Sequence, residues 1–142
     1  MTTNTIFSGF GGQGVLSMGF TLASAAMLEG RYVTYLPSYG VEVRGGTANC
    51  TVVVSDEEIA SPVASEPEFV VAMNQPSFNR FQNILQSGGL MCVNASLVNA
   101  SSVRSDIEVL SIPTSELAEQ LGTIKVANMI MLGALIRASN IR

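Results

Sequence analysis

The sequence predicts an α/β protein, a single Rossmann-like domain with three layers and a mostly parallel sheet. Short runs of Val, Ile, Leu and Phe alternate with helical segments, as in parallel sheets covered on both faces. A glycine-rich turn joins the first expected strand to the first expected helix. The chain of 142 residues suffices for one core and is too short for two, so we expect one domain over residues 1–142.

The first half of the chain contains three expected strands and one helix. Residues 4–10 (NTIFSGF) form a buried strand, and the apolar segment 15–28 after the glycines forms a helix. Residues 31–39 and 47–55 are rich in β-branched residues and form two further strands. Because only the short glycine loop 40–46 separates them, we expect these two strands to form one antiparallel pair.

The second half continues the alternation after a charged, proline-bearing connection at residues 56–67. The expected strands are the apolar runs at residues 68–74, 88–97 and 107–113. The expected helices lie at residues 75–85, 114–122 and 125–138. Pro76 suits the first turn of the earliest of these helices, and Thr114 or Ser115 can cap the next one.

The composition excludes several classes of function. The chain has no histidine, so imidazole general bases, Ser-His triads and histidine-ligated metals are excluded. The seven basic residues are scattered and the net charge is −4, so nucleic acid is not an expected partner. Two cysteines are too few for an iron–sulfur cluster. Cys50 and Cys92 stand in strand-like runs and are expected to be buried, reduced thiols.

No targeting segment is apparent in the sequence, and its apolar stretch at residues 126–136 is too short to cross a bilayer. We therefore expect a cytoplasmic protein that does not bind membranes. Charged residues make up only 13% of the chain, well below the roughly 25% of average soluble domains. So sparse a charge predicts that much of the surface is covered by another chain or domain.

The first expected helix also predicts contact with another chain or domain. Its polar residues Ser17, Thr21 and Ser24 lie on one stripe, where a surface helix would carry Lys or Glu. A small, uncharged stripe favours contact with another chain or domain. The alternative is a central helix that is buried within its own domain.

The glycine-rich turn matches a phosphate-binding pattern. Residues Gly9 to Gly14 read GFGGQG and fit G-x-G-x-x-G between a strand and a helix, where backbone N–H groups and the helix N-terminus attract anions. A dinucleotide site also needs an acidic residue at the end of the second strand. Glu29 lies too early for this role and Glu42 too late, which weighs against NAD. The glycines could instead serve only a tight turn with close helix packing.

A second glycine loop strengthens the ligand hypothesis. The segment Glu42-Val43-Arg44-Gly45-Gly46 places a guanidinium, which can donate two hydrogen bonds to a phosphate or carboxylate, beside two residues without side chains. In an open α/β sheet both loops could border the crevice in which ligands bind. The alternative for Arg44 is an ion pair with a nearby glutamate.

Three segments together resemble a known family. GFGGQGV, LPSYGVEVRGGTANC and VVAMNQPSF are similar to the gamma subunit, or gamma domain, of the 2-oxoacid:ferredoxin oxidoreductases that act on pyruvate, 2-oxoisovalerate or 2-oxoglutarate. The resemblance runs from about Ile6 to Ile136. Two departures stand out. Val41 replaces a common proline of the family, and family members often continue some tens of residues past Arg142, which implies a short or truncated C-terminal end.

The resemblance implies a non-catalytic subunit of a larger enzyme. In that family the complex decarboxylates a 2-oxoacid with coenzyme A as co-substrate, giving acyl-CoA, CO2 and reduced ferredoxin. Thiamine pyrophosphate, Mg and iron–sulfur clusters would sit on partner subunits, and this chain would bind no cofactor tightly and no metal. Its partners would be thiamine-binding alpha and beta subunits and a ferredoxin-like subunit. An isolated chain could pair with a second copy of itself.

The resemblance also implies which residues help to form the coenzyme A site and assigns no catalytic residue. The expected binding residues are Gly9, Gly11, Gly12, Gln13, Gly14, Tyr39, Glu42, Arg44, Gly45, Gly46 and Asn74. Arg44 would bind an anionic group of coenzyme A. Asn74 ends a strand at the presumed ligand edge, and its alternative role is to cap the helix that begins near Pro76. Two other functions stay open, a free-standing nucleotide-binding regulatory module and a small NAD(P) enzyme.

Overall fold

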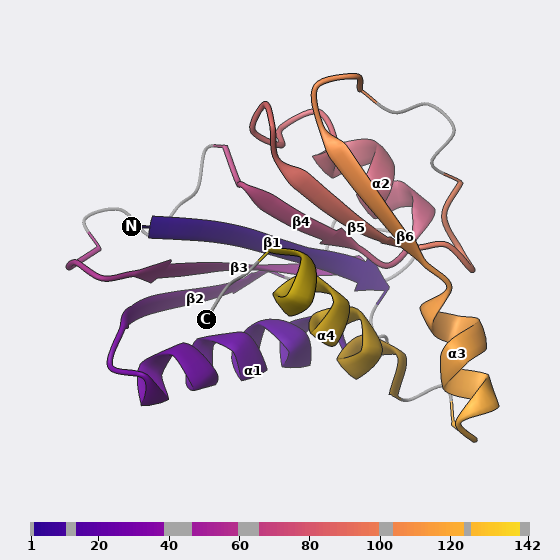
Figure 1. Ribbon diagram of the computed structural model, residues 1–142, viewed down its shortest axis with the longest axis horizontal. Helices are drawn as coiled ribbons and strands as arrows, with labels where there is room; N and C mark the ends of the chain where they lie inside the picture. Colours follow the sequence, from indigo (N-terminus) through magenta and orange to yellow (C-terminus); the bar gives the residue numbers. More distant parts are fainter. Residues whose placement is uncertain are drawn as a thin grey trace.

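The computed structural model describes residues 2–10, 14–38, 47–59, 66–99, 104–123 and 126–139. It confirms the α/β class, with one six-stranded sheet between helices (Figure 1). The strands are β1 (Thr2–Phe10), β2 (Tyr32–Ser38), β3 (Thr47–Ser55), β4 (Phe69–Ala72), β5 (Leu90–Asn94) and β6 (Glu108–Ile112). The helices are α1 (Val15–Leu28), α2 (Gln75–Phe81), α3 (Thr114–Gln120) and α4 (Ala127–Ser139).

The sheet has the strand order β2-β3-β1-β4-β5-β6. Three of the five strand pairings among the described residues are parallel: β1–β4, β4–β5 and β5–β6. The expected antiparallel pair of β2 and β3 is confirmed. The structure adds a second antiparallel pairing, because β3 also pairs with β1. β3 is thus inserted between β1 and β2 and runs against the other strands.

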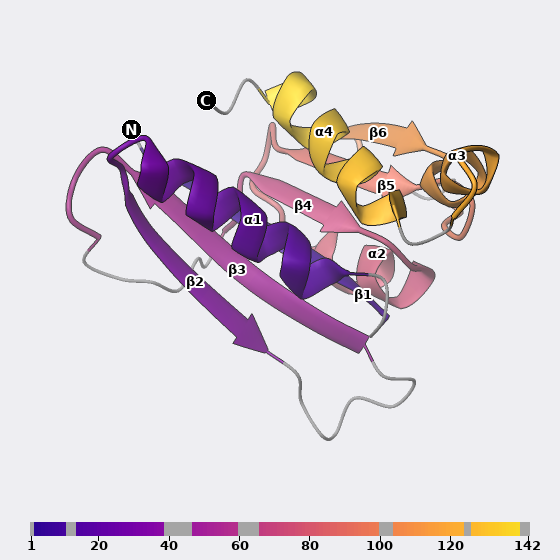
Figure 2. The same ribbon diagram turned by 90° about the horizontal axis from the view of Figure 1, so that it is seen from below.

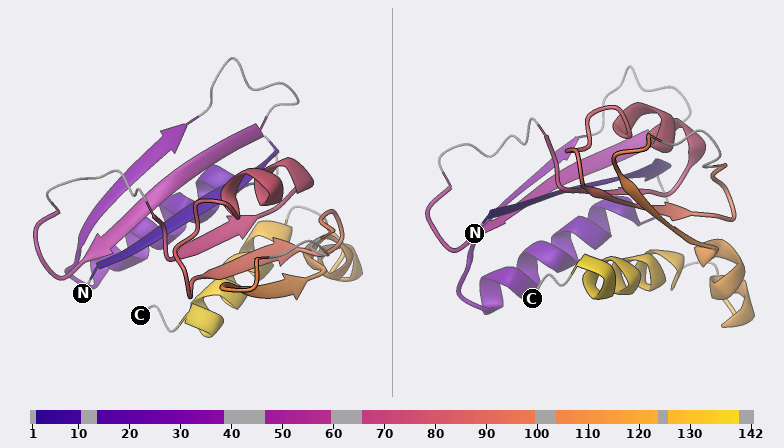
Figure 3. Two further views of the ribbon diagram at one scale, coloured as in Figure 1. Left: turned by 90° about the horizontal axis from the view of Figure 1, so that it is seen from above. Right: turned by 45° about the horizontal axis from the view of Figure 1, so that its top comes forward.

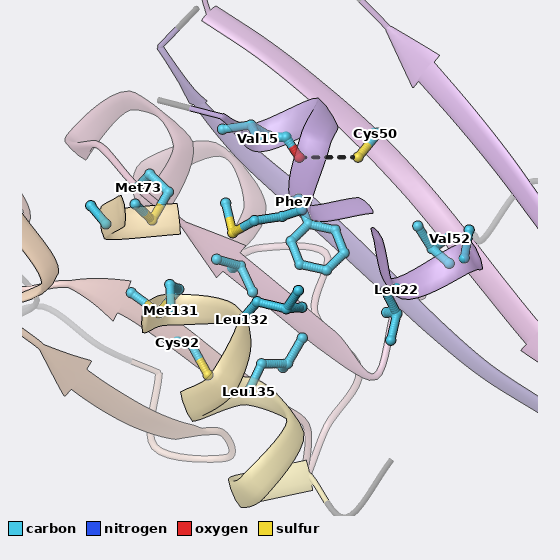
Figure 4. Close-up of a cluster of buried hydrophobic side chains, with 14 of the residues drawn as sticks. Phe7, Val15, Leu22, Cys50, Val52, Met73, Cys92, Met131, Leu132 and Leu135 are labelled. Atoms are coloured by element: carbon cyan, nitrogen blue, oxygen red, sulfur yellow. Dashed lines mark hydrogen bonds between the residues drawn. The ribbon is translucent and has the colours of Figure 1, made fainter. Parts of the chain in front are cut away.

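The helices cover the two faces of the sheet unequally. α1 and α4 lie side by side on one face, and α2 lies on the opposite face (Figures 2 and 3). Two apolar cores follow from this arrangement. The larger core joins α1 and α4 to alternate strand residues such as Phe7, Cys50 and Cys92 (Figure 4). The smaller core packs Phe78 and Phe81 of α2 onto the other side chains of β1, β4 and β5.

The expected start of α3 was wrong in one respect. The helix begins at Thr114, and its N-cap Pro113 has no side chain that can accept a hydrogen bond. The N–H groups of Ser115 and Glu116 donate instead to Asn94 Oδ1 at 3.5 Å and Ser96 Oγ at 3.3 Å. The Ser115 hydroxyl accepts a hydrogen bond from Asn94 Nδ2 at 2.9 Å, and Asn94 is the fully buried last residue of β5. The Ser115 hydroxyl therefore makes a tertiary contact and does not cap the helix as the sequence pattern predicted.

Candidate functional site

The sheet has a switch point at the end of β1. After β1 the chain continues into α1 and then β2 on one side of β1, and after β4 it continues through α2 into β5 on the other side. The helices α1 and α2 pack on opposite faces of the sheet. Open α/β sheets bind ligands in the crevice outside the carboxyl ends of their strands at such a point. The fold therefore places the candidate site beside the ends of β1 and β4.

Strand residues that flank the two glycine loops are paired at this point. Phe10, the last residue of β1, is the register partner of Thr47, the first residue of β3, and Gly9 is the partner of Ala48. The first glycine loop begins directly after Phe10, and the second ends directly before Thr47. The antiparallel insertion of β3 thus brings together two chain positions that lie 37 residues apart in sequence (47 − 10 = 37).

Eight of the predicted binding residues lie outside the described residues. They are Gly11, Gly12, Gln13, Tyr39, Glu42, Arg44, Gly45 and Gly46. The structure describes the three others, Gly9, Gly14 and Asn74, and all three lie at the carboxyl-terminal ends of β1 and β4 or at the helices that follow them. The roles of the eight remain predictions.

The first turn of α1 suits an anion. Gly14 is its N-cap with φ +74° and ψ +25°, a left-handed conformation that favours glycine. Its carbonyl accepts the helical hydrogen bond from the Met18 N–H at 2.9 Å. No side chain of the described residues caps the helix, and its first turn contains no acidic residue. Within the part of the chain that the structure describes, the leading N–H groups of α1 therefore have no side-chain cap, and no acidic residue in the first turn opposes an anion there.

Asn74 has the capping role that the sequence offered as its alternative. It is the N-cap of α2 and is only 1% exposed, and its Oδ1 accepts a hydrogen bond from the Ser77 N–H at 2.9 Å. The capping prediction is confirmed. Its Nδ2 is buried and has no hydrogen-bond partner among the described residues. Because the cap fixes Oδ1 as the acceptor, Nδ2 is a spare donor at the end of β4.

Two serines tie Asn74 to β1. The Ser8 and Ser77 hydroxyls form a buried hydrogen bond of 2.7 Å. The Met73 N–H donates to the Ser8 carbonyl at 2.8 Å. The spare amide donor is consequently held on the same edge of the sheet as the start of the first glycine loop.

One residue of this region was not singled out from the sequence. Asn128, in the first turn of α4, donates from Nδ2 to the Gly14 carbonyl at 3.4 Å. The two residues are 114 positions apart. The only local signal was a polar residue at the start of a mainly apolar helix, which does not identify a partner so distant in sequence.

The outer side of α1 is exposed, which excludes the alternative of a helix buried within its own domain. Ser17 and Thr21 of the uncharged stripe are exposed, and Ser24 is half-buried. Large apolar side chains lie nearby, since Phe20 is 61% exposed and Leu28 is 90% exposed. This surface is apolar and contains no charged residue between Val15 and Leu28.

Both cysteines are free and buried, as predicted. Burial raises the pKa of Cys50 and of Cys92 to about 12, so both are neutral thiols near pH 7. The Cys50 thiol donates to the Val15 carbonyl at 3.7 Å (Figure 4). Among the described residues, no three His, Cys, Asp or Glu side chains gather as a metal site. Within the same residues, none of the helices has the length and apolar character to span a membrane.

Two curated relatives are similar to this chain over most of its length. It is 43% identical over 129 residues to the ketoisovalerate oxidoreductase subunit VorA of Methanothermobacter thermautotrophicus. The aligned region covers 91% of this chain and 27% of VorA. It is 38% identical over 141 residues to the 2-oxoglutarate synthase subunit KorC of Methanothermobacter marburgensis, which covers 94% of this chain and 76% of KorC. The chain therefore spans about a quarter of one relative and three quarters of the other.

The fold also matches a solved structure. The 2-oxoglutarate:ferredoxin oxidoreductase from Magnetococcus marinus, with 2-oxoglutarate, coenzyme A and succinyl-CoA bound, superposes with a TM-score of 0.86 at 22% identity, covering 95% of this chain and 24% of the other. The family model for pyruvate ferredoxin/flavodoxin oxidoreductase matches residues 4–142. The chain thus belongs to the pyruvate ferredoxin/flavodoxin oxidoreductase family, in which it corresponds to the gamma subunit or gamma domain.

Proposed function

We propose that this chain is the gamma subunit of a cytoplasmic 2-oxoacid:ferredoxin oxidoreductase and that residues 1–142 form one gamma-type domain. In the complex it would pack on thiamine-binding subunits and help to form the coenzyme A site, while thiamine pyrophosphate, Mg and iron–sulfur clusters would be bound by partners. The observation that carries the site is the pairing of Phe10 with Thr47, which joins the ends of both glycine loops at the switch point.

The chemistry of the site supports a co-substrate with anionic and amide groups. The uncapped first turn of α1 favours a negative group such as a phosphate. The spare Asn74 Nδ2 can donate to a carbonyl or phosphoryl oxygen. Coenzyme A carries both kinds of acceptor, and it is bound in the Magnetococcus marinus enzyme. The exposed, uncharged side of α1 supports packing against another subunit, because such a surface is poorly solvated alone.

The function is tested first with Arg44→Ala in the complex purified with its co-expressed partners. A charge-assisted hydrogen bond contributes about 1.5–3 kcal/mol, so we expect KM for coenzyme A to rise roughly 10- to 150-fold while the subunits still co-purify. Steady-state kinetics with the 2-oxoacid saturating measures this. A chain that ignores thiamine-binding partners and binds NADH alone would contradict the proposal.

Asn74 is tested with two variants that separate its roles. Asn74→Ser keeps an oxygen that can cap α2, whereas Asn74→Ala removes the cap, so we expect Ala to cost about 1 kcal/mol more in unfolding free energy than Ser. Both variants remove the spare donor, and both should raise KM for coenzyme A about 5-fold. If Asn74→Ser has the wild-type KM for coenzyme A, Asn74 does not bind the co-substrate and serves only as a helix cap.

A further inference from the structure

We propose that Asn128 of α4 positions Gly14, the N-cap of α1, and thereby sets the affinity of the site for coenzyme A. This inference rests on the function proposed above. Asn128 is a positioning residue, because its contact is with the Gly14 carbonyl and not with a ligand.

The amide of Asn128 has a defined orientation. Its Oδ1 accepts a hydrogen bond from the Met129 N–H at 2.9 Å, which leaves Nδ2 as the donor to Gly14. The side chain is half-buried, so its hydrogen bond is partly shielded from water.

Gly14 is fitted closely to this contact. A Cβ at Gly14 would overlap Nδ2 of Asn128, and the positive φ of +74° also disfavours any other residue. Gly14 is both the last residue of the first glycine loop and the N-cap of α1. Its carbonyl accepts from Met18 within α1 and from Asn128 across the interface. Both helices therefore fix the point at which the loop ends.

The helix that carries Asn128 is packed into the larger core. Met131 and Leu135 of α4 are completely buried in the larger core, and Ala127 is 7% exposed. The first turns of α1 and α4 lie at the same end of the sheet (Figure 2). Asn128 thus holds the Gly14 carbonyl from a packed helix, and a preorganised N-terminus of α1 loses less conformational entropy when it binds a ligand, which strengthens affinity.

The test uses Asn128→Ala and Asn128→Asp in the full chain assembled with its partners. Loss of one hydrogen bond of about 1 kcal/mol should raise KM for coenzyme A about 5-fold with kcat within about two-fold. Asn128→Asp keeps the shape of the side chain and replaces the donor with an acceptor that repels the Gly14 carbonyl. It should raise KM at least as much as Ala, whereas a purely space-filling role predicts the wild-type value for Asp.

The matched control is Asn83→Ala. Asn83 Nδ2 donates to the Asn79 carbonyl at the same distance of 3.4 Å, just beyond α2 on the opposite face of the sheet. This variant should leave KM for coenzyme A unchanged. The amide resonances of Gly14 and Val15, measured by NMR on the full chain, give a second readout that needs no ligand. They should shift in both Asn128 variants and not in Asn83→Ala.

The outcomes distinguish this inference from the proposed function. In one outcome Arg44→Ala raises KM for coenzyme A, whereas Asn128→Asp has the wild-type KM and an unshifted Gly14 resonance. This result would overturn the role of Asn128 and leave the coenzyme A function intact. If the Arg44 and Asn128 variants all have the wild-type KM for coenzyme A, the coenzyme A function is overturned. The proposed influence of Asn128 on that affinity is then overturned as well. Raised KM and shifted resonances in both Asn128 variants would support the inference.

Discussion

Replacing Phe7 with alanine is expected to lower the free energy of unfolding by about 3–5 kcal/mol. Phe7 is completely buried, and its ring lies between side chains of α1 and α4, among them Leu22, Leu132 and Leu135 (Figure 4). Its removal leaves a cavity that both helices line and cannot readily fill. Urea unfolding of the purified chain measures the loss, and Phe7→Leu should lose less because most of the volume is kept.

Phe20→Ala is the matched control for Phe7→Ala. Phe20 is 61% exposed and makes an edge-to-face contact with Tyr35 at a centroid distance of 5.9 Å, so its loss should cost about 1 kcal/mol in the isolated chain. In the co-expressed complex the same variant should reduce the recovery of partner subunits, because the exposed side of α1 is proposed to pack on them. Equal destabilisation by both variants would contradict the assignment of Phe7 to the core.

Gly19→Ala should destabilise the chain by about 2 kcal/mol although alanine is the better helix former. A Cβ at Gly19 would overlap the Cys50 sulfur and approach Tyr35 Cε1 at 3.2 Å. Overpacking of a core costs about 1–3 kcal/mol, which exceeds the gain of up to about 1 kcal/mol in helix propensity. Gly133→Ala is the control, since Gly133 lies on the exposed side of α4 and no described atom lies within 4 Å of its Cβ, and it should stabilise by about 0.5–1 kcal/mol.

A double variant identifies the cause of the Gly19 effect. Cys50→Ala removes the sulfur that the new methyl group would overlap, so Gly19→Ala should cost less in that background than in the wild type. The comparison uses unfolding midpoints of all four chains. Strict additivity would show that the sulfur is not the obstacle and that Tyr35 or Val52, the two other side chains near the new methyl group, is.

The elements that could be predicted closely are those with local signals. α1 has the predicted bounds Val15–Leu28, since a left-handed glycine precedes a long apolar run. β3 also has the predicted bounds Thr47–Ser55, because β-branched residues continue without interruption between a glycine loop and a charged segment. These boundaries depend on neighbours in sequence and needed no knowledge of the fold.

α2 shows why other boundaries were missed. Its apolar pattern predicted a helix to residue 85, yet the helix ends at Phe81. Arg104 Nη1 donates to the carbonyls of Gln82 at 2.7 Å and Leu85 at 2.8 Å. These carbonyls thus have a partner 19 to 22 residues away, and a local pattern cannot reveal such a partner.

The candidate site was predicted as two loops at one sheet edge, and the strand residues Phe10 and Thr47 beside those loops are paired. The loops between them lie mostly outside the described residues, so their placement stays a prediction. Two features could not be read from the residues. The position of β3 between β1 and β2 depends on pairing across the sheet, and the spare Asn74 donor depends on which oxygen and nitrogen of its amide the cap occupies.

The contact of Asn128 with Gly14 has a consequence for synthesis of the chain. The two residues are separated by 114 positions, and at about 5–20 residues per second the ribosome needs roughly 6–23 seconds to add them. Throughout that interval Gly14 has been synthesised without the amide that donates to its carbonyl. A nascent chain can therefore form β1 and α1, and pair β1 with β3 and β4, before the contact that fixes Gly14 exists.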